Sequence, residues 1–193
     1  DINYILTPRA DWNHANAIHY NETFDQIMIS IHHFSELWII DHSTTTEEAA
    51  GHTGGTYGRG GDLLYRWGNP QTYGAGTSAD QKLFQQHDTQ WIESGLPGEG
   101  DILIFNNGQG RPEGDYSSVD QISPPVDEFG VYTLEPGQAF QPDGPNWSYT
   151  AEDPFDFYSS FISGAQRLPN GNTLICSGAN GTIFEVTETH DIV

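Results

Sequence analysis

Positively charged side chains are scarce in this sequence of 193 residues. Lys and Arg together number 6 against 27 Asp and Glu, which gives a formal net charge of −21 at pH 7. A surface of that sign repels nucleic acids and anionic lipids, so neither is expected as a partner. The acids are dispersed through aromatic-rich sequence, which indicates an ordered acidic surface and not a disordered acidic tail. An anionic ligand would need a local basic pocket, and each arginine is therefore informative.

Cysteine and long apolar runs are also lacking. Cys176 is the only cysteine, which excludes an intrachain disulfide and a cysteine-rich zinc site. Its apolar surroundings, NTLICSG, predict a buried structural thiol. No window of about 18 apolar residues exists, so a membrane span is not expected. The sequence starts at Asp1 without a basic, apolar leader, so any signal peptide is expected to have been removed or never to have belonged to this sequence.

What the sequence does contain is turn residues and aromatics. It has 22 Gly and 11 Pro, and aromatic residues make up 12% of it. This composition favours many short strands over long helices.

Three segments share one plan, in which a polar head is followed by a turn and then by a short apolar strand. They begin at His14 (HANAIHYNETFDQIMIS), His87 (HDTQWIESGLPGEGDILIF) and Ser163 (SGAQRLPNGNTLIC), a spacing of 73 and 76 residues. Each turn carries Asn, Gly or Pro. A near-constant period of this kind indicates a repeated structural unit.

Further strands are expected after each of these hairpins. Third strands are predicted over residues 36–41, 117–122 and 181–186, and fourth strands over residues 62–67 and 146–151. Four antiparallel strands with an aromatic in the last one are typical of a β-propeller blade. We therefore predict an all-β chain, residues 1–193 forming a partial β-propeller with blade units that begin near residues 11, 84 and 158. A β-sandwich is the alternative fold, but it does not predict the repeated heads.

About two and a half blades are fewer than the four to eight that close a propeller. An open fan exposes apolar faces between blades, so we expect further blades from the same or another chain beside this one. Strands near residues 26–32, 36–41, 101–106 and 172–176 are predicted to be central in their blades.

Several stretches together resemble the arylsulfotransferase family, the bacterial-type aryl-sulfate sulfotransferases. They are DWNHANAIHYN, ELWIIDHSTTTEEAAGHTGG, GGDLLYRWGNPQTYG, QQHDTQWI, ILIFNNGQGRP and FISGAQRLPNGNTLI, and they cover most of the sequence. The resemblance implies a six-bladed propeller that is secreted, to the periplasm or the extracellular space. It also implies that channel histidines carry a sulfuryl group from an aryl sulfate to a phenol.

The repeat heads supply the candidate catalytic residues. The first strand of each blade lines a propeller's channel, so His14 and His87 should converge there and act as nucleophile and general acid/base. Arg111 is the best candidate for holding the sulfuryl oxygens. Asn16, two residues from His14, and Asn106 and Asn107, just before Arg111, are the candidate substrate-binding residues.

The remaining histidines and arginines are expected to be structural. We expect His19, His32 and His33 to belong to the scaffold, and Arg66 and Arg167 to pair with neighbouring acids. His32 and His33 end a strand, so the alternative that they reach the rim of the channel stays open. The glycine-rich segment 44–62 lacks the ending of a phosphate-binding loop and is predicted to be a blade insertion. No metal ligand set and no cofactor is predicted, although loop carboxylates leave structural calcium open. Asn21, Asn146 and Asn180 begin N-x-[ST] triplets, which matter only in a eukaryotic secretory pathway.

Ser163 stands where the repeat would place a third histidine. If the family's sulfate carrier belongs to that blade, this chain lacks it. Two alternatives to sulfuryl transfer therefore stay open, a non-catalytic propeller that binds sulfate esters or phenols and a structural or assembly subunit.

Overall fold

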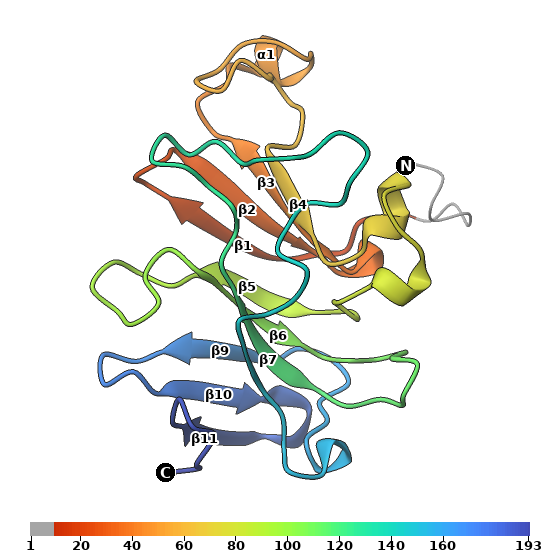
Figure 1. The fold of residues 1–193 in the computed structure, drawn as a ribbon, viewed down its shortest axis with the longest axis vertical. Coiled ribbons are helices and arrows are strands. Elements are labelled where there is room, and N and C mark those ends of the chain that lie inside the picture. Colours follow the sequence, from red (N-terminus) through yellow and green to blue (C-terminus); the bar gives the residue numbers. More distant parts are fainter. Residues whose placement is uncertain (1–9) are drawn as a thin grey trace.

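The computed structural model describes residues 10–193, and these form three antiparallel β-sheets that follow one another along the chain (Figure 1). Helical structure in this range is limited to the four-residue α1 (Thr46–Ala49) and to short 3-10 turns. The predicted all-β class is confirmed. Each sheet is called a blade below, numbered from the N-terminus.

Blade 1 contains four strands in the order in which the chain makes them. They are β1 (Ala15–Asn21), β2 (Gln26–Ile31), β3 (Glu36–Asp41) and β4 (Tyr65–Trp67). The 3-10 turn η1 (His32–Phe34) joins β2 to β3 and ends at Ser35, whose φ of 54° lies in the left-handed region. Residues 42–64, with α1, form the expected insertion between β3 and β4.

Blade 2 repeats this order with β5 (His87–Trp91), β6 (Ile102–Asn106), β7 (Ser118–Ile122) and β8 (Trp147–Tyr149). Between β4 and β5 lie the 3-10 turns η2 (Pro70–Tyr73) and η3 (Ser78–Asp80). The fourth strands β4 and β8 are three residues long, shorter than the six predicted, because β3 and β7 pair with them over three residues only.

Blade 3 has three strands, β9 (Gly164–Arg167), β10 (Thr173–Ser177) and β11 (Thr182–Val186). The turn η4 (Pro154–Asp156) precedes it and η5 (Gly178–Asn180) joins β10 to β11. After β11 the chain returns to form a single bridge between Ile192 and Val186. Within the described residues the three blades form an open fan and do not close a ring (Figure 1).

The hydrophobic core is divided between the two gaps that separate the blades. Strand β6 is buried along its whole length because it faces both gaps. Ile102 and Ile104 pack towards blade 1 with Met28 and Leu37, whereas Leu103 and Phe105 pack towards blade 3. The alternation follows from the two-residue period of a strand. Strands β2, β3, β6 and β10 are central in their sheets and pack between blades, as predicted.

The connection between β7 and β8, residues 123–146, leaves blade 2 and runs across blade 1 (Figure 1). Tyr132 stacks on Tyr65 with ring centroids 4.8 Å apart, and its hydroxyl donates to Gln26 Oε1 at 2.9 Å. The Tyr65 hydroxyl donates to the carbonyl of Gln141, and Trp67 Nε1 donates to the carbonyl of Pro142, both at 2.8 Å. The connection therefore completes the core of blade 1 from outside that blade.

A buried ion pair between Glu36 and Arg66 links strands β3 and β4 of blade 1. Glu36 is fully buried, and Arg66 Nη2 lies 2.5 Å from its Oε2. Burial raises the pKa of the Glu36 carboxyl, although the Arg66 charge acts in the opposite direction. The guanidinium also lies over the ring of Tyr73 at 4.2 Å. Arg66 thus has the structural role predicted for it.

Two predictions for single residues are wrong. Cys176 is only half-buried, because it lies on the face of β10 that no further blade covers. Among the described residues Arg167 forms no salt bridge: its guanidinium donates to Gln121 Oε1 and to the carbonyl of Gly171, while Glu188 and Asp101 act on its charge from a greater distance.

Candidate functional site

Four histidines gather where the inner strands of blades 1 and 2 begin. His14 directly precedes β1, His32 and His33 start η1 after β2, and His87 is the first residue of β5. The ring of His32 lies 4.7 Å from that of His14, 5.2 Å from that of His33 and 5.3 Å from that of His87, measured between centroids. The His14 and His33 rings are 4.9 Å apart. The two predicted histidines, His14 and His87, thus flank a third one, His32.

The backbone of blade 1 brings three of these histidines together. The His32 N–H donates to the carbonyl of His14 at 3.2 Å, and the His33 N–H donates to the carbonyl of Asn13 at 3.3 Å. These bonds extend the pairing of β1 with β2 beyond the strand ends. His14 has a φ of 49°, a left-handed conformation that is uncommon for a residue with a side chain and frequent at functional sites.

Asn107 fixes the tautomer of His87. Its Nδ2 donates to the carbonyls of Ser159 at 2.8 Å and Ile162 at 2.9 Å, so its Oδ1 must be the atom that faces His87 Nδ1, 2.8 Å away. An amide oxygen accepts only, and Nδ1 of His87 therefore carries the hydrogen. The lone pair of the ring is left on Nε2.

His14 and His33 also present Nδ1 to an acceptor. His14 Nδ1 lies 2.5 Å from Oδ2 of Asp11, and the His14 side chain is 42% exposed. His33 Nδ1 lies 3.3 Å from the carbonyl oxygen of Trp12. A carboxylate or carbonyl on Nδ1 holds the imidazole ring in a fixed orientation.

Burial favours the neutral form in the inner part of the cluster. It lowers the pKa of His87, although hydrogen bonds of the ring to Asn107 and to the backbone of Gln85 work against this shift. Burial and the neighbouring histidines His87, His14 and His33 lower the pKa of His32 to about 4. At neutral pH both rings are uncharged, so the Nε2 of His87 is available as a nucleophile or base.

The predicted substrate-binding asparagines are engaged with the scaffold. Asn106 and Asn107 are fully buried. Asn106 accepts from the Phe84 N–H and donates to Asp120 Oδ2 and to the Lys82 carbonyl. Asn16 donates to the carbonyl of Gln86 at 2.8 Å, which ties β1 to the start of β5.

Arg111 lies in the wall of a hollow of about 490 Å³ that Lys82 also lines. Its Nε donates to the carbonyl of Tyr116 at 3.1 Å and its Nη2 to Ser118 Oγ at 2.8 Å. The guanidinium lies 4.4 Å from the centre of the Tyr116 ring. The structure thus places two of the six cationic side chains at one hollow, and none of these Arg111 contacts is to a histidine of the cluster.

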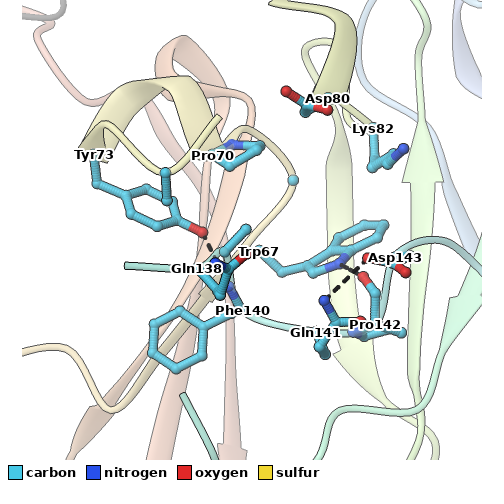
Figure 2. A pocket seen from close by; sticks show the side chains of 13 residues that line it. Trp67, Pro70, Tyr73, Asp80, Lys82, Gln138, Phe140, Gln141, Pro142 and Asp143 are labelled. Carbon is cyan, nitrogen blue, oxygen red and sulfur yellow. Dashed lines mark hydrogen bonds between the residues drawn. The ribbon is translucent and has the colours of Figure 1, made fainter. Parts of the chain in front are cut away.

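A second hollow, of about 390 Å³, lies between β4 and the β7–β8 connection (Figure 2). Trp67 and Tyr73 come from blade 1 and its following turn, and Phe140 to Asp143 come from the connection. The Tyr73 hydroxyl accepts from the Phe140 N–H, and the dashed lines in Figure 2 show that these polar groups bond to one another. None of the residues that line this hollow is a histidine.

His19 and Ser163 have structural contacts in this arrangement. His19 Nδ1 accepts from the Trp91 N–H at 3.2 Å, which joins β1 to β5 as a scaffold residue would. Ser163 precedes β9 as His14 precedes β1, and it also has a positive φ, of 92°. Its hydroxyl accepts from the N–H of Gly178, which is the first residue of η5. Blade 3 therefore repeats the backbone of the site without its histidines.

Asp11, His32 and His33 are site residues that sequence reasoning missed. The available signal was the pair HH at the end of an apolar strand, next to a head that already contained DWNH. The contacts between these segments depend on the pairing of β1 with β2, which brings residues 18 positions apart side by side.

The fold and the cluster define the class of protein, an all-β chain of repeated antiparallel blades with histidines at the start of its inner strands. The profile of the arylsulfotransferase (ASST) family matches residues 5–192, and the chain belongs to that family. No curated protein gives a significant match to the chain. Residues 10–193 contain no helix with the length and apolar character that crossing a membrane requires.

Proposed function

We propose that this chain transfers a sulfuryl group from an aryl sulfate to a phenol and that Nε2 of His87 is the nitrogen that carries it. The observation behind this assignment is the Asn107 amide, which holds the hydrogen of His87 on Nδ1. A neutral imidazole with a fixed, available lone pair is the form that attacks an electrophile. Membership of the arylsulfotransferase family supplies the class of donor and acceptor.

In the first half-reaction, Nε2 of His87 attacks the sulfur of the aryl sulfate. An N–S bond forms, the bond between sulfur and the aryl oxygen breaks, and the leaving phenolate takes a proton. In the second half-reaction an acceptor phenol gives up its proton and attacks the same sulfur. The N–S bond breaks, which restores the neutral imidazole and releases the new aryl sulfate.

His14 is proposed as the group that gives and takes these protons. The carboxylate of Asp11 lies 2.5 Å from its Nδ1 and orients the ring, as an acid beside a catalytic histidine does. His32 lies between His14 and His87, and its ring contacts the rings of both. Asn107 is proposed to position His87 instead of binding substrate, because all its polar side-chain atoms are engaged.

Arg111 is proposed to attract the anionic donor. Sulfuryl oxygens need positive charge. Arg111 and Lys82 line one hollow together with Glu113 and Asp120, and the guanidinium of Arg111 is held there by its bonds to Tyr116 and Ser118. We expect Arg111→Ala to weaken transfer by a few kcal/mol at most, in the range of one lost charged donor.

The test is an assay of the full chain with p-nitrophenyl sulfate as donor and a second phenol as acceptor. We expect His87→Gln and His14→Gln each to lower the rate by about 100-fold or more, because groups that act as a unit fail together. Mass spectrometry of the wild-type chain quenched during turnover should find a sulfuryl adduct on His87. His52→Gln is the matched control, since His52 also pairs with an aspartate, Asp62, at 2.7 Å but lies outside the cluster.

Full activity in the His87 variant, or an adduct on another residue, would refute the assignment. A wild-type chain that binds p-nitrophenyl sulfate without turnover would favour the non-catalytic alternative, in which Ser163 marks a lost catalytic blade.

The chain is further proposed to be a partial propeller over residues 1–193, with further blades at its open sides. Ile18 on β1 and Ile183 on β11 are 72% and 67% exposed, and they lie on the outer two blades of the fan. Exposed apolar side chains at such places favour burial by a neighbouring blade. Sedimentation velocity of residues 1–193 alone should show association, and a stable monodisperse monomer would contradict this proposal.

Export of the protein is proposed on family membership alone. Fractionation of cells that express the natural gene would test it, with an intracellular location as the contrary result.

A further inference from the structure

Among residues 10–193, one group of three potential metal ligands stands close together: Asp11, His14 and His33. One carboxylate oxygen and two ring nitrogens, one from each residue, all lie within 4.8 Å of one another. We propose that these three side chains form a binding site for a divalent transition-metal ion of the zinc class. The set of two histidines and one carboxylate leaves coordination positions open for water or another ligand.

The separations suit such an ion after small side-chain movements. Ligand atoms about 2 Å from a tetrahedral zinc ion are roughly 3.3 Å apart. Coordination by Nδ1 of His14 displaces the hydrogen between this atom and Asp11, and the contact of 2.5 Å would open by about 1 Å. The wider separations, which reach at most 4.8 Å, would close by up to about 1.5 Å. The side chain of His14 is 42% exposed, so its ring has room to turn.

The surroundings of His33 already resemble those of a ligand. Its Nδ1 faces the Trp12 carbonyl, an arrangement that leaves Nε2 as the coordinating atom and holds the ring in place. The His33 backbone is fixed as well, by its N–H bond to Asn13.

His32 provides an independent sign that a polar ligand belongs here. Its Nδ1 is buried, and no group in the described part of the chain forms a hydrogen bond with it. Such an atom calls for a water molecule or an ion nearby. The ring of His32 lies next to two of the proposed ligands, 4.7 Å from the ring of His14 and 5.2 Å from that of His33 between centroids.

The other pairs of histidine and aspartate within residues 10–193 lack this third partner. His52 pairs with Asp62 at 2.7 Å and His42 with Asp25 at 2.6 Å, but neither pair belongs to a described group of three. A single such pair is a weak metal site, so affinity should be confined to the cluster.

Metal binding has a consequence for transfer, and this consequence rests on the proposed function. An ion that takes the lone pair of His14 would prevent this residue from exchanging protons with the phenols. Zinc should therefore inhibit sulfuryl transfer, and a chelator should restore it.

The primary experiment measures metal binding alone. The full chain, freed of metal with a chelator, is titrated with Zn²⁺ by calorimetry and with Co²⁺ by visible absorption. We expect one ion per chain at micromolar concentrations. We expect His33→Gln and Asp11→Asn each to weaken binding by at least about tenfold, the lower bound for losing even a supporting residue. His52→Gln should bind as the wild type does.

A second measurement needs no variant, in case one of them fails to fold. Zn²⁺ should protect His14 and His33 of the wild-type chain from acylation by diethyl pyrocarbonate, while His52 stays reactive. Absence of binding by the wild-type chain, equal binding by His33→Gln, or equal modification with and without Zn²⁺ would each overturn the proposal. These results do not depend on turnover, so a chain without transfer activity can still confirm the metal site.

Discussion

At the scale of single residues, the state of the His87 ring determines how the site responds to pH. Burial lowers its pKa below the usual value for histidine, so the nucleophilic neutral form persists into mildly acidic solution. The rate of transfer should fall on acidification only below the usual histidine range. A pH profile of kcat/KM in the wild-type chain measures this fall of the rate on acidification, and a midpoint above pH 7 would contradict the prediction.

Asn107→Asp tests the hydrogen bond between residue 107 and His87 by shifting the pKa of His87 in the opposite direction. A carboxylate at Nδ1 favours the imidazolium form and raises the pKa of His87, so the acidic limb should move to higher pH. The variant also loses the two donations to Ser159 and Ile162, which makes a circular dichroism check of the fold necessary. An unchanged pH midpoint in a folded variant would exclude His87 as the titrating group.

The site could be predicted from the sequence only where the repeat exposed it. His14 and His87 head two units of the repeat, and that position alone placed both near the inner strands. His32 and His33 carry no such signal, because their place depends on a 3-10 turn whose tertiary contacts no local pattern encodes. Asn107 is adjacent to a predicted strand, yet its role depends on carbonyls that are 52 and 55 residues away.

At the scale of elements, the β7–β8 connection should contribute to stability as a core element does. Tyr132 is buried against Tyr65 in the core between blades 1 and 2. We expect Tyr132→Ala to lower the free energy of unfolding by about 3–5 kcal/mol, the range for removing a buried aromatic side chain. Tyr132→Phe should cost less, about 1–3 kcal/mol, because it keeps the packing but leaves the buried Gln26 Oε1 without this donor.

Urea denaturation of both variants and of Phe129→Ala checks this prediction. Phe129 belongs to the same connection but is 72% exposed, so its removal should change stability by less than about 0.5 kcal/mol. Equal losses in Tyr132→Ala and Phe129→Ala would show that the connection is not part of the core.

Strands and connections differ in how well the sequence predicts them. Segments such as IMIS and ILIF combine β-branched residues with flanking turn residues, and the structure has strands at both. The connection over residues 123–146 contains isolated aromatics between Pro, Gly and Asp, without a period of two or of 3.6. Its path over blade 1 is determined by tertiary packing, which explains why the sequence did not reveal it.

At the scale of the whole molecule, net charge should make stability depend on salt. A chain with 27 acids and 6 cations repels itself in the compact state, and dissolved ions screen that repulsion. We expect the melting temperature to rise when KCl is increased from about 0.1 M to about 1 M, where the screening length falls to roughly 3 Å. Differential scanning fluorimetry measures this, and a melting temperature that falls with salt would contradict it.

The path of the β7–β8 connection also has a consequence for synthesis of the chain on the ribosome. The strands of blade 1 are complete once Trp67 has emerged, but the Tyr65 hydroxyl finds its partner 76 residues later in the sequence. At translation speeds of about 5–20 residues per second, the side of blade 1 that carries Tyr65 stays uncovered for roughly 4–15 s. During that interval the nascent first blade presents an apolar surface to chaperones and to other nascent chains, and its folding cannot finish before most of blade 2 has been made.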